Sequence, residues 1–228
     1  MEEIWNGFVQ ALGLIASRDP EVLEITRRTL MISVSSTSIA SAISVPLGSL
    51  IHFNRFRGKR VLVSVIQTLF SVPTVVVGLL VFITFSRAGP LGELDLLFSP
   101  PAIIIGEVVL ITPLILGLII SALSGLDRAV GETAISLGAT RLQMVLLSLR
   151  EAKFAVLAAV IMGYGRAFSE VGLALMVGGN IRGFTRTLTT TISLETSKGN
   201  IELSMALGII LLLIALAINV TLNRLQQR

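Results

Sequence analysis

A short polar island of the chain reads Gly131-Glu132-Thr133-Ala134-Ile135-Ser136-Leu137-Gly138-Ala139-Thr140-Arg141. It lies between two long apolar blocks, residues 102–124 and 154–177. Apolar runs of about twenty residues have the length that a helix needs to cross a bilayer. A helix also satisfies its own backbone hydrogen bonds inside lipid, whereas barrel strands would alternate apolar and polar residues. The blocks therefore predict membrane-spanning helices, and the island predicts a folded element in the loop between two of them.

The composition of the whole chain leads to the same class. Its 228 residues are 53% hydrophobic and only 14% charged, with a mean hydropathy of +0.88, whereas a soluble domain carries about 25% charged residues. We therefore expect an all-α, polytopic membrane protein. The absence of cysteine excludes disulfides and thiolate metal sites. The net charge of +4 is interpreted as topology signals beside the spans rather than as a nucleic-acid site.

The apolar segments predict a single transmembrane domain over residues 1–228. Five spans are expected, at residues 29–53, 61–86, 102–124, 154–177 and 203–223. Residues 1–28 form an N-terminal amphipathic segment that is too short and too polar to span, and residues 125–152 form the loop that holds the island. The acidic start Met1-Glu2-Glu3 does not fit a signal peptide, so no cleaved export signal is expected.

Basic residues in the short loops set the expected orientation, because cytoplasmic loops carry an excess of Lys and Arg. Residues 54–60 are rich in basic residues and contain no acid, and the C-terminal tail carries Arg224 and Arg228. We therefore place the N-terminus outside, and the C-terminus and the island in the cytoplasm. Arg27-Arg28, just ahead of the first span, favours the opposite orientation.

Around the island the pattern predicts a helix, a glycine turn and an amphipathic helix. Asp127 can cap the first helix, and Gly138 can end it because glycine tolerates the left-handed conformation. Thr140 and Gln143 have the spacing of a capping box for the second helix. Two apolar faces follow at helical spacing: Val130, Ala134 and Leu137, then Leu142, Val145, Leu146 and Leu149. An interfacial loop helix without a partner is the alternative interpretation.

Charged residues inside the spans are the next candidates. Arg166 and Glu170 are four residues apart, so they lie on neighbouring helical turns and can pair. Charge in lipid usually faces a bundle interior or a water-filled path. A role in lining or bracing the pathway and a purely structural ion pair both remain open. Glu107 is expected to reach towards the nearer membrane interface.

Small residues and prolines indicate where spans can approach one another or bend. Ala159, Gly163 and Ala167 recur at four-residue steps, which allows another helix to approach closely. Prolines inside the spans can kink them by freeing backbone carbonyls. They are Pro46, Pro73 and Pro113.

The stretch that leaves the fourth span is rich in glycine, arginine and threonine. Its glycines expose backbone N–H groups, and its other side chains add donors suited to a hydrated oxyanion. The candidate pathway residues here are Gly179, Asn180, Arg182, Thr185 and Arg186. An ordinary flexible outer loop is the alternative.

The island resembles the cytoplasmic signature of binding-protein-dependent ABC-transporter permeases. That signature is Glu-Ala-Ala, three residues and Gly, and here it reads Glu132-Thr133-Ala134-Ile135-Ser136-Leu137-Gly138. The resemblance implies a coupling helix, within residues 127–141, that sits in a cleft of an ATP-binding subunit. It assigns Glu132 as a polar contact, Ala134 as the small residue of a close approach and Gly138 as the turn, with Thr133 and Ala139 beside them. Thr133 departs from the usual alanine, and Arg150-Glu151 stands where Leu-Pro often follows.

Further blocks resemble the tungstate and molybdate permeases, the tungstate branch above all. They are Ser71–Gly78, Arg87–Gly92, Ser169–Gly172, Gly178–Gly183 and Thr185–Thr190. The resemblance implies a type I, molybdate-permease-like bundle of about five transmembrane helices in the cytoplasmic membrane. It implies a homodimer with two ATP-binding subunits and an extracytoplasmic solute-binding protein that delivers the oxyanion. ATP would be bound by the partner subunit, so no catalytic residue, metal site or cofactor is expected in this chain.

Three other functions stay open at this point. A permease of this kind could carry another oxyanion, such as sulfate or phosphate. A secondary transporter or channel would need no ATPase, and would be expected to show inverted repeats, which the sequence does not show. A membrane anchor for a soluble enzyme would explain the island, but not the charged pair or the outer glycines.

Overall fold

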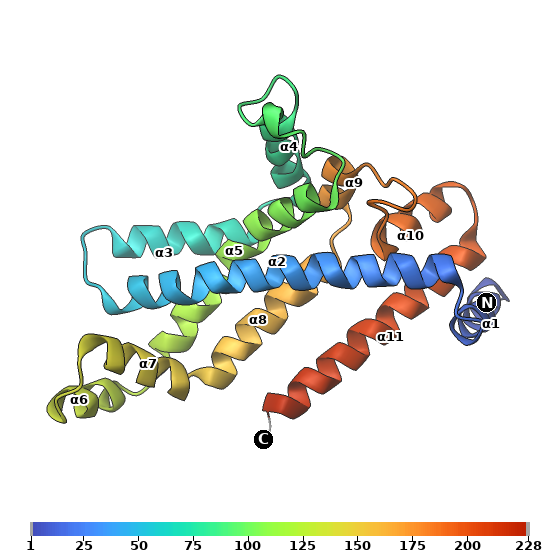
Figure 1. Ribbon diagram of the computed structural model, residues 1–228. Helices are drawn as coiled ribbons and strands as arrows, with labels where there is room; N and C mark the ends of the chain where they lie inside the picture. Colours follow the sequence, from blue (N-terminus) through green and yellow to red (C-terminus); the bar gives the residue numbers. More distant parts are fainter. Residues whose placement is uncertain (1, 227–228) are drawn as a thin grey trace. The chain divides into compact units, whose positions relative to one another are not determined.

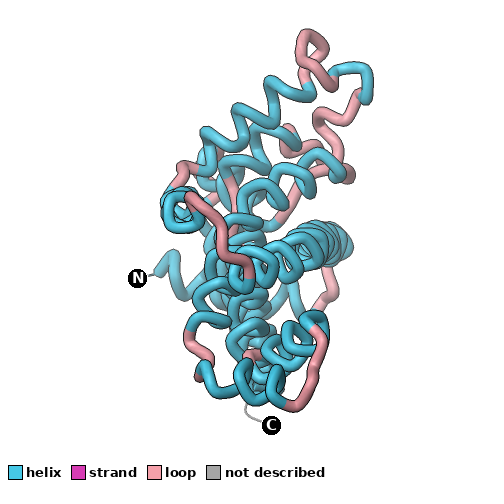
Figure 2. Tube along the Cα trace, turned by 90° about the vertical axis from the view of Figure 1, so that its left-hand side faces the viewer, coloured by secondary structure: helices cyan, strands magenta, loops and turns pink. Residues whose placement is uncertain are grey.

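The computed structural model describes residues 2–226, so Met1 and the last two residues, including Arg228 of the topology argument, lie outside it (Figure 1). Within these residues every regular element is helical, as the all-α prediction requires, and helix makes up most of the trace in Figure 2. The elements are α1 (Glu2–Ala16), α2 (Pro20–Phe53), α3 (Lys59–Thr68), η1 (Leu69–Ser71), α4 (Thr74–Phe85), η2 (Gly92–Leu94), α5 (Pro100–Ser124), α6 (Arg128–Ser136), α7 (Arg141–Glu151), α8 (Lys153–Phe168), α9 (Gly172–Gly178), α10 (Leu188–Ser197) and α11 (Ile201–Gln226).

The chain divides into two compact units. The first comprises residues 1–36, 73–107 and 165–228, and the second comprises residues 37–72 and 108–164. Helices α2, α5 and α8 each contribute residues to both units. Each unit is described by itself below.

In the first unit, the short helix α9 packs closely against α4 and forms part of the interior. Leu173 and Val177 of α9 are fully buried. Ala174 joins Ile32 of α2 and Ile103 of α5 in one apolar cluster. Seven residues alone make a marginal helix, so packing of this kind must stabilise α9.

A second apolar cluster of the first unit holds α1 and α10 against α11. Its buried members include Ala11 of α1, Leu188 of α10 and Leu207 of α11, together with Ile25 of α2. These residues come from opposite ends of the sequence. The cluster therefore brings the N-terminal helix to the start of the C-terminal one (Figure 1).

The second unit is built around the later part of α5. Ile115 and Ile119 are fully buried, and Leu116 and Ile120 pack with Ile66 of α3. The small-residue prediction for the fourth span holds at Gly163 of α8, where a Cβ atom would lie 2.5 Å from the Ile115 side chain. That helix can approach α5 closely because the position carries no side chain.

The candidate membrane spans correspond to the five predicted segments. Three helices within the described residues are long and apolar enough to cross a membrane: Pro20–Phe53, Pro100–Ser124 and Ile201–Thr221. The number rises to five if two interrupted pairs, α3 with α4 and α8 with α9, each count as one span. The interruptions are a finding, because a continuous helix was expected over residues 61–86 and 154–177.

Proline explains the first interruption, and hydrogen bonds satisfy the backbone of the second. Between η1 and α4 the backbone is extended at Val72 and Pro73, and proline has no N–H to continue a helix. Between α8 and α9, the Glu170 carboxylate accepts the Leu173 N–H (3.0 Å), and the Thr189 hydroxyl donates to the Glu170 carbonyl (2.7 Å). Irregular backbone survives in a membrane protein only when such partners satisfy its polar groups.

Candidate functional site

The island folds as predicted into a helix, a glycine turn and a helix, all within the second unit. The Asp127 carboxylate accepts the Ala129 N–H (2.9 Å) and so caps the start of α6. Thr140 and Gln143 form the predicted capping box of α7, each side chain accepting the other residue's backbone N–H. Local polar side chains thus define both helix starts.

The turn between α6 and α7 is a Schellman motif. The Gly138 N–H donates to the Ile135 carbonyl (2.9 Å), and the Ala139 N–H donates to the Ala134 carbonyl (3.0 Å). Gly138 has a φ of 80°, in the region that side-chain-bearing residues rarely adopt. Glycine is therefore strongly favoured at this position by the backbone of the turn.

Exposure differs between the residues of the island. Ala134 is 5% exposed, whereas Ile135 and Leu137 are 62% and 82% exposed, and Glu132 and Thr133 are exposed as well. The first helix was predicted to include Leu137 on the face of Ala134, but α6 ends at Ser136 and Leu137 is its C-cap residue. The tip of the island thus presents two large apolar side chains beside a carboxylate.

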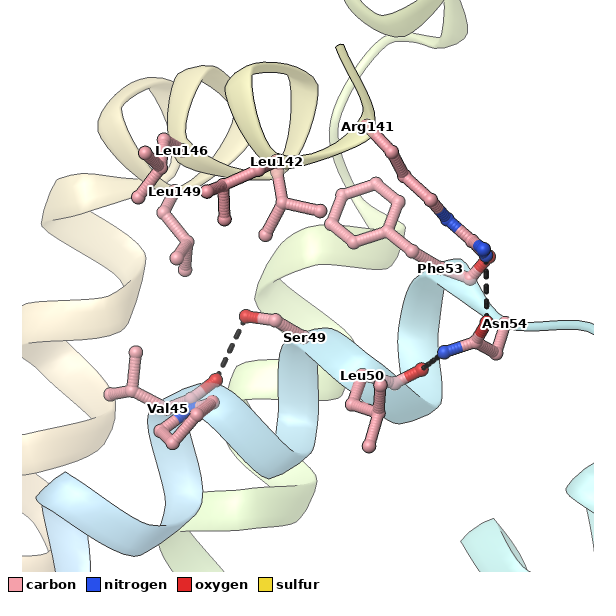
Figure 3. A pocket seen from close by; sticks show the side chains of 11 residues that line it. Val45, Ser49, Leu50, Phe53, Asn54, Arg141, Leu142, Leu146 and Leu149 are labelled. Atoms are coloured by element: carbon pink, nitrogen blue, oxygen red, sulfur yellow. Dashed lines mark hydrogen bonds between the residues drawn. The ribbon is translucent and has the colours of Figure 1, made fainter.

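Arg141 attaches the island to the end of α2. Its guanidinium donates to the Asn54 side-chain oxygen (2.7 Å) and to the Phe53 carbonyl (3.4 Å) (Figure 3). The predicted leucine stripe of α7 then faces α2 across an apolar groove of about 610 Å³. Leu142, Leu146 and Leu149 line it from α7, and Val45 and Leu50 line it from α2 (Figure 3).

Below the tip, α6 faces the ends of α2 and α5 across a second hollow of about 570 Å³. Glu132 and Ile135 line it from α6, His52 lines it from α2, and Ser124 lines it from α5. The Ser124 hydroxyl and the His52 ring lie 3.2 Å apart. A displacement of α6 towards this hollow would therefore bring it against side chains of α2 and α5, two long apolar helices.

The predicted Arg166–Glu170 pair is present in the first unit, with 3.5 Å between Arg166 Nη1 and Glu170 Oε2. The Glu170 side chain is only 2% exposed, whereas that of Arg166 is 37% exposed. Because Glu170 also accepts from the first turn of α9, the pair holds the interruption between α8 and α9. This geometry supports the structural interpretation, and a role in the pathway stays a prediction.

The segment after α9, residues 179–187, is a corner held by its own hydrogen bonds. Gly179, Asn180 and Gly183 all have positive φ values. Thr185 is 1% exposed, and its hydroxyl donates to the Gly178 carbonyl (2.6 Å) and accepts the Ile181 N–H (2.8 Å). This hydroxyl is thus occupied in holding the corner.

The two arginines of the corner are paired with an acid from α2. Arg182 donates to both carboxylate oxygens of Glu21, and Arg186 Nη1 lies 3.6 Å from the same carboxylate. The hydrogen bonds to Glu21 raise the pKa of the Arg182 guanidinium. An anion that reached these arginines would have to compete with Glu21.

Comparisons with known proteins identify the family. Residues 44–228 match the family described as the inner membrane component of binding-protein-dependent transport systems. The chain belongs to this family. It is 42% identical to the permease protein TupB of a tungstate uptake system from Peptoclostridium acidaminophilum, over the whole of both chains. It is 37% identical to the corresponding Campylobacter jejuni protein, over 100% of this chain and 95% of that one.

The fold of the permease agrees with this assignment. A solved structure of the MetNI methionine ABC transporter, in an inward-facing conformation, matches 92% of this chain and 97% of its own with a TM-score of 0.72. At 20% identity this likeness concerns the fold alone. The predicted family and helical architecture are confirmed, and the permease is a multi-pass protein of the inner membrane.

Two acids of the permease lie in contacts that the sequence did not predict. Glu21 was not singled out, although its contact with Arg182 joins residues far apart in the chain. Glu107 is 3% exposed and bonded to the Ser36 hydroxyl, so the prediction that it reaches the membrane interface is wrong. The sequence does show one polar residue in each of two spans, Ser36 and Glu107. That they bond to each other depends on how the two helices pack.

Proposed function

We propose that this permease forms the translocation path of an ATP-driven oxyanion importer, with tungstate as the anion and molybdate as the next candidate. The observation that carries the proposal is the end-to-end similarity, at 42% and 37% identity, to two permeases of tungstate uptake systems. Residues 1–228 then act as one transmembrane permease domain, with residues 1–28 as its N-terminal amphipathic segment.

The island is the docking element for the ATPase in this proposal. Residues 127–141 couple ATP-driven closure of the ATPase subunits to the membrane helices. Glu132 and Thr133 supply polar contacts, Ala134 allows a close approach, and Gly138 with Ala139 forms the turn. The exposed Ile135 and Leu137 add apolar surface that binding would bury, and such burial favours association.

The complete transporter is a homodimer of this permease with two ATP-binding subunits and an extracytoplasmic binding protein. ATP is bound and hydrolysed by the partner subunits, and this chain has no catalytic role. The N-terminus lies outside and the C-terminus lies in the cytoplasm. The candidates for the pathway and its gate are Arg166, Glu170, Gly179, Asn180, Arg182, Thr185 and Arg186.

Reconstitution tests this function. Permease, ATPase and binding protein are combined in proteoliposomes, and uptake of radioactive tungstate is measured with and without ATP. We expect ATP-dependent uptake that excess molybdate reduces and excess sulfate or phosphate leaves unchanged. If the binding protein preferred sulfate or phosphate, the assignment of tungstate as the substrate would be wrong. If uptake needed no ATP, the assignment as an ATP-driven importer would be wrong.

The docking surface is tested separately in the same system. Ile135→Ser and Leu137→Ser should lower co-purification of the ATPase and uptake together. Leu146→Ser is the matched control, because Leu146 is similarly exposed but lies on α7, away from the tip. Normal uptake by both tip variants would exclude this surface as the docking site.

A further inference from the structure

The N-terminal helix α1 carries its large apolar side chains on the exposed side. Five of these side chains are between 42% and 67% exposed: Trp5, Phe8, Val9, Leu12 and Ile15. Its described polar side chains do not form an outer polar face. Asn6 donates to Glu202 of α11 (3.1 Å), and the Gln10 side-chain oxygen is buried. A surface helix in water has the opposite arrangement.

The other side of α1 is packed against α11 and sets the rotation of the helix. Ala11 is 1% exposed and lies in the apolar cluster with Ala206 and Ile210. Gly7 lies so close to α11 that a Cβ atom there would be 2.5 Å from Met205 Cβ. Because this contact requires a glycine, the Trp5–Ile15 side faces away from α11.

The length and connection of α1 place it at one boundary of the bilayer. Its 15 residues measure about 22 Å along the axis, which is less than the roughly 30 Å of the hydrocarbon core. A short turn follows, and the Asp19 carboxylate accepts the N–H groups of Glu21 (3.0 Å) and Val22 (2.9 Å) at the start of α2. Helix α1 therefore lies beside the first turns of α2 and of α11 (Figure 1).

We propose that α1 is an interfacial membrane helix whose exposed side is embedded in the leaflet that holds the start of α2. The occupant of this side is lipid, namely the acyl chains and the glycerol region. Neighbouring membrane helices also carry exposed apolar side chains, such as Met31 and Val34 on α2 and Leu212 on α11, so lipid is already the solvent around them. Tryptophan favours the membrane interface, where its ring contacts lipid and its N–H contacts water.

Trp5 makes the proposal directly measurable, because it is the only tryptophan in the sequence. The full chain is reconstituted in phosphatidylcholine vesicles that contain lipid brominated at a shallow, middle or deep acyl position. We expect Trp5 fluorescence to be quenched by brominated lipid, most strongly at the shallow position, and only weakly by aqueous iodide. Dominant iodide quenching without lipid quenching would place the helix in water and overturn the proposal.

A second copy of the chain is the other possible occupant, and the same measurement separates it from lipid. Trp5 would then be shielded from both quenchers, and Leu12→Cys would form a disulfide between two copies. That combined result would also overturn the proposal.

Moving the tryptophan tests the rotation of the helix. In a Trp5→Phe background, Leu12→Trp should be quenched by shallow brominated lipid as Trp5 is. Leu14→Trp, two residues away and packed against the α11 cluster, should be at least threefold less quenched. Equal quenching at both positions would contradict the fixed rotation, and the wild-type measurement remains decisive if Leu14→Trp does not fold.

Discussion

At the scale of single residues, Gly138 matters because of its backbone conformation. Its φ of 80° lies in the left-handed region, and a Cβ atom there would meet no neighbour within 4 Å. The cost of a side chain at this position is therefore conformational and not steric. Asparagine tolerates this region better than other residues with side chains.

We predict that Gly138→Ala destabilises the turn between α6 and α7 by about 1 kcal/mol, and that it lowers ATPase association and ATP-dependent uptake if this turn docks on the ATPase as proposed. Gly138→Asn should be affected less. Gly131→Ala is the matched control, because Gly131 lies inside α6, where alanine favours the helix. The amount of ATPase that co-purifies is compared for all three variants. Normal ATPase association of Gly138→Ala would show that the geometry of the turn is dispensable.

Glu107 of α5 is buried and bonded to Ser36 of α2. The Ser36 hydroxyl oxygen lies 2.5 Å from both the Ile32 carbonyl oxygen and Glu107 Oε2. A serine hydroxyl has one proton, and a carbonyl oxygen cannot donate. If Ser36 donates to Ile32, the second hydrogen bond needs a proton on Glu107. A carboxylate that accepts from Ser36 and a neutral acid that donates to it would both satisfy this contact.

We predict that Glu107→Gln is tolerated, because the amide keeps the length of the side chain and can still bond to the Ser36 hydroxyl. Glu107→Asp should destabilise the protein by about 1–3 kcal/mol, since a shorter acid leaves a buried polar group without its partner. Thermal unfolding in detergent and uptake rates measure both variants. If a negative charge at position 107 were essential, the order would reverse, with Asp tolerated and Gln impaired.

At the scale of elements, helix contacts depend on where glycine allows close approach. Gly7 and Gly13 lie on the same helix, six residues apart. A Cβ atom added to Gly7 would lie 2.5 Å from Met205 Cβ, whereas one added to Gly13 would have no neighbour within 4 Å. Helix propensity changes equally at both positions, so the difference between them isolates the α1–α11 contact.

We predict that Gly7→Ala destabilises the protein by about 1–3 kcal/mol through overpacking, whereas Gly13→Ala is neutral or stabilises it by about 0.5–1 kcal/mol. Thermal unfolding of the two variants in the same detergent is the measurement. Equal unfolding temperatures would mean that α1 is not held tightly against α11.

An element could be predicted from the sequence when the interactions that form it lie within a few residues. The starts of α6 and α7 and the Gly138 turn were predicted correctly, because Asp127, Thr140 and Gln143 act on backbone within three residues. The interruption after α8 was not predicted. Its backbone is satisfied by Thr189, which is distant in sequence, and no local pattern records that contact.

At the scale of the whole molecule, the expected topology can be tested because the sequence contains no cysteine. Single cysteines then label without background. We predict that Leu137→Cys, at the exposed tip of the island, reacts with an impermeant maleimide only from the cytoplasmic side. Phe184→Cys, 49% exposed in the native side chain, should react only from the outer side.

Maleimide labelling of both variants is measured in parallel in right-side-out and inverted vesicles. The orientation argued from Arg55, Arg57, Lys59 and Arg60 predicts opposite labelling of the two positions. The reversed pattern would mean that Arg27-Arg28 controls insertion instead. Labelling of both positions from one side would contradict the number of crossings between them.

The sequence by itself determined the membrane class, the five apolar segments and the helix–glycine–helix island, since each follows from composition or from interactions a few residues apart. The resemblance of several sequence motifs to those of known permeases then indicated the family. The tertiary structure decided which polar groups are occupied: Thr189 bonds to the Glu170 carbonyl, Glu21 pairs with Arg182, Glu107 bonds to Ser36, and α1 keeps its apolar side outward. These outcomes depend on helices that meet only after folding, and a partner across 70 or 160 residues leaves no periodic signal in the chain.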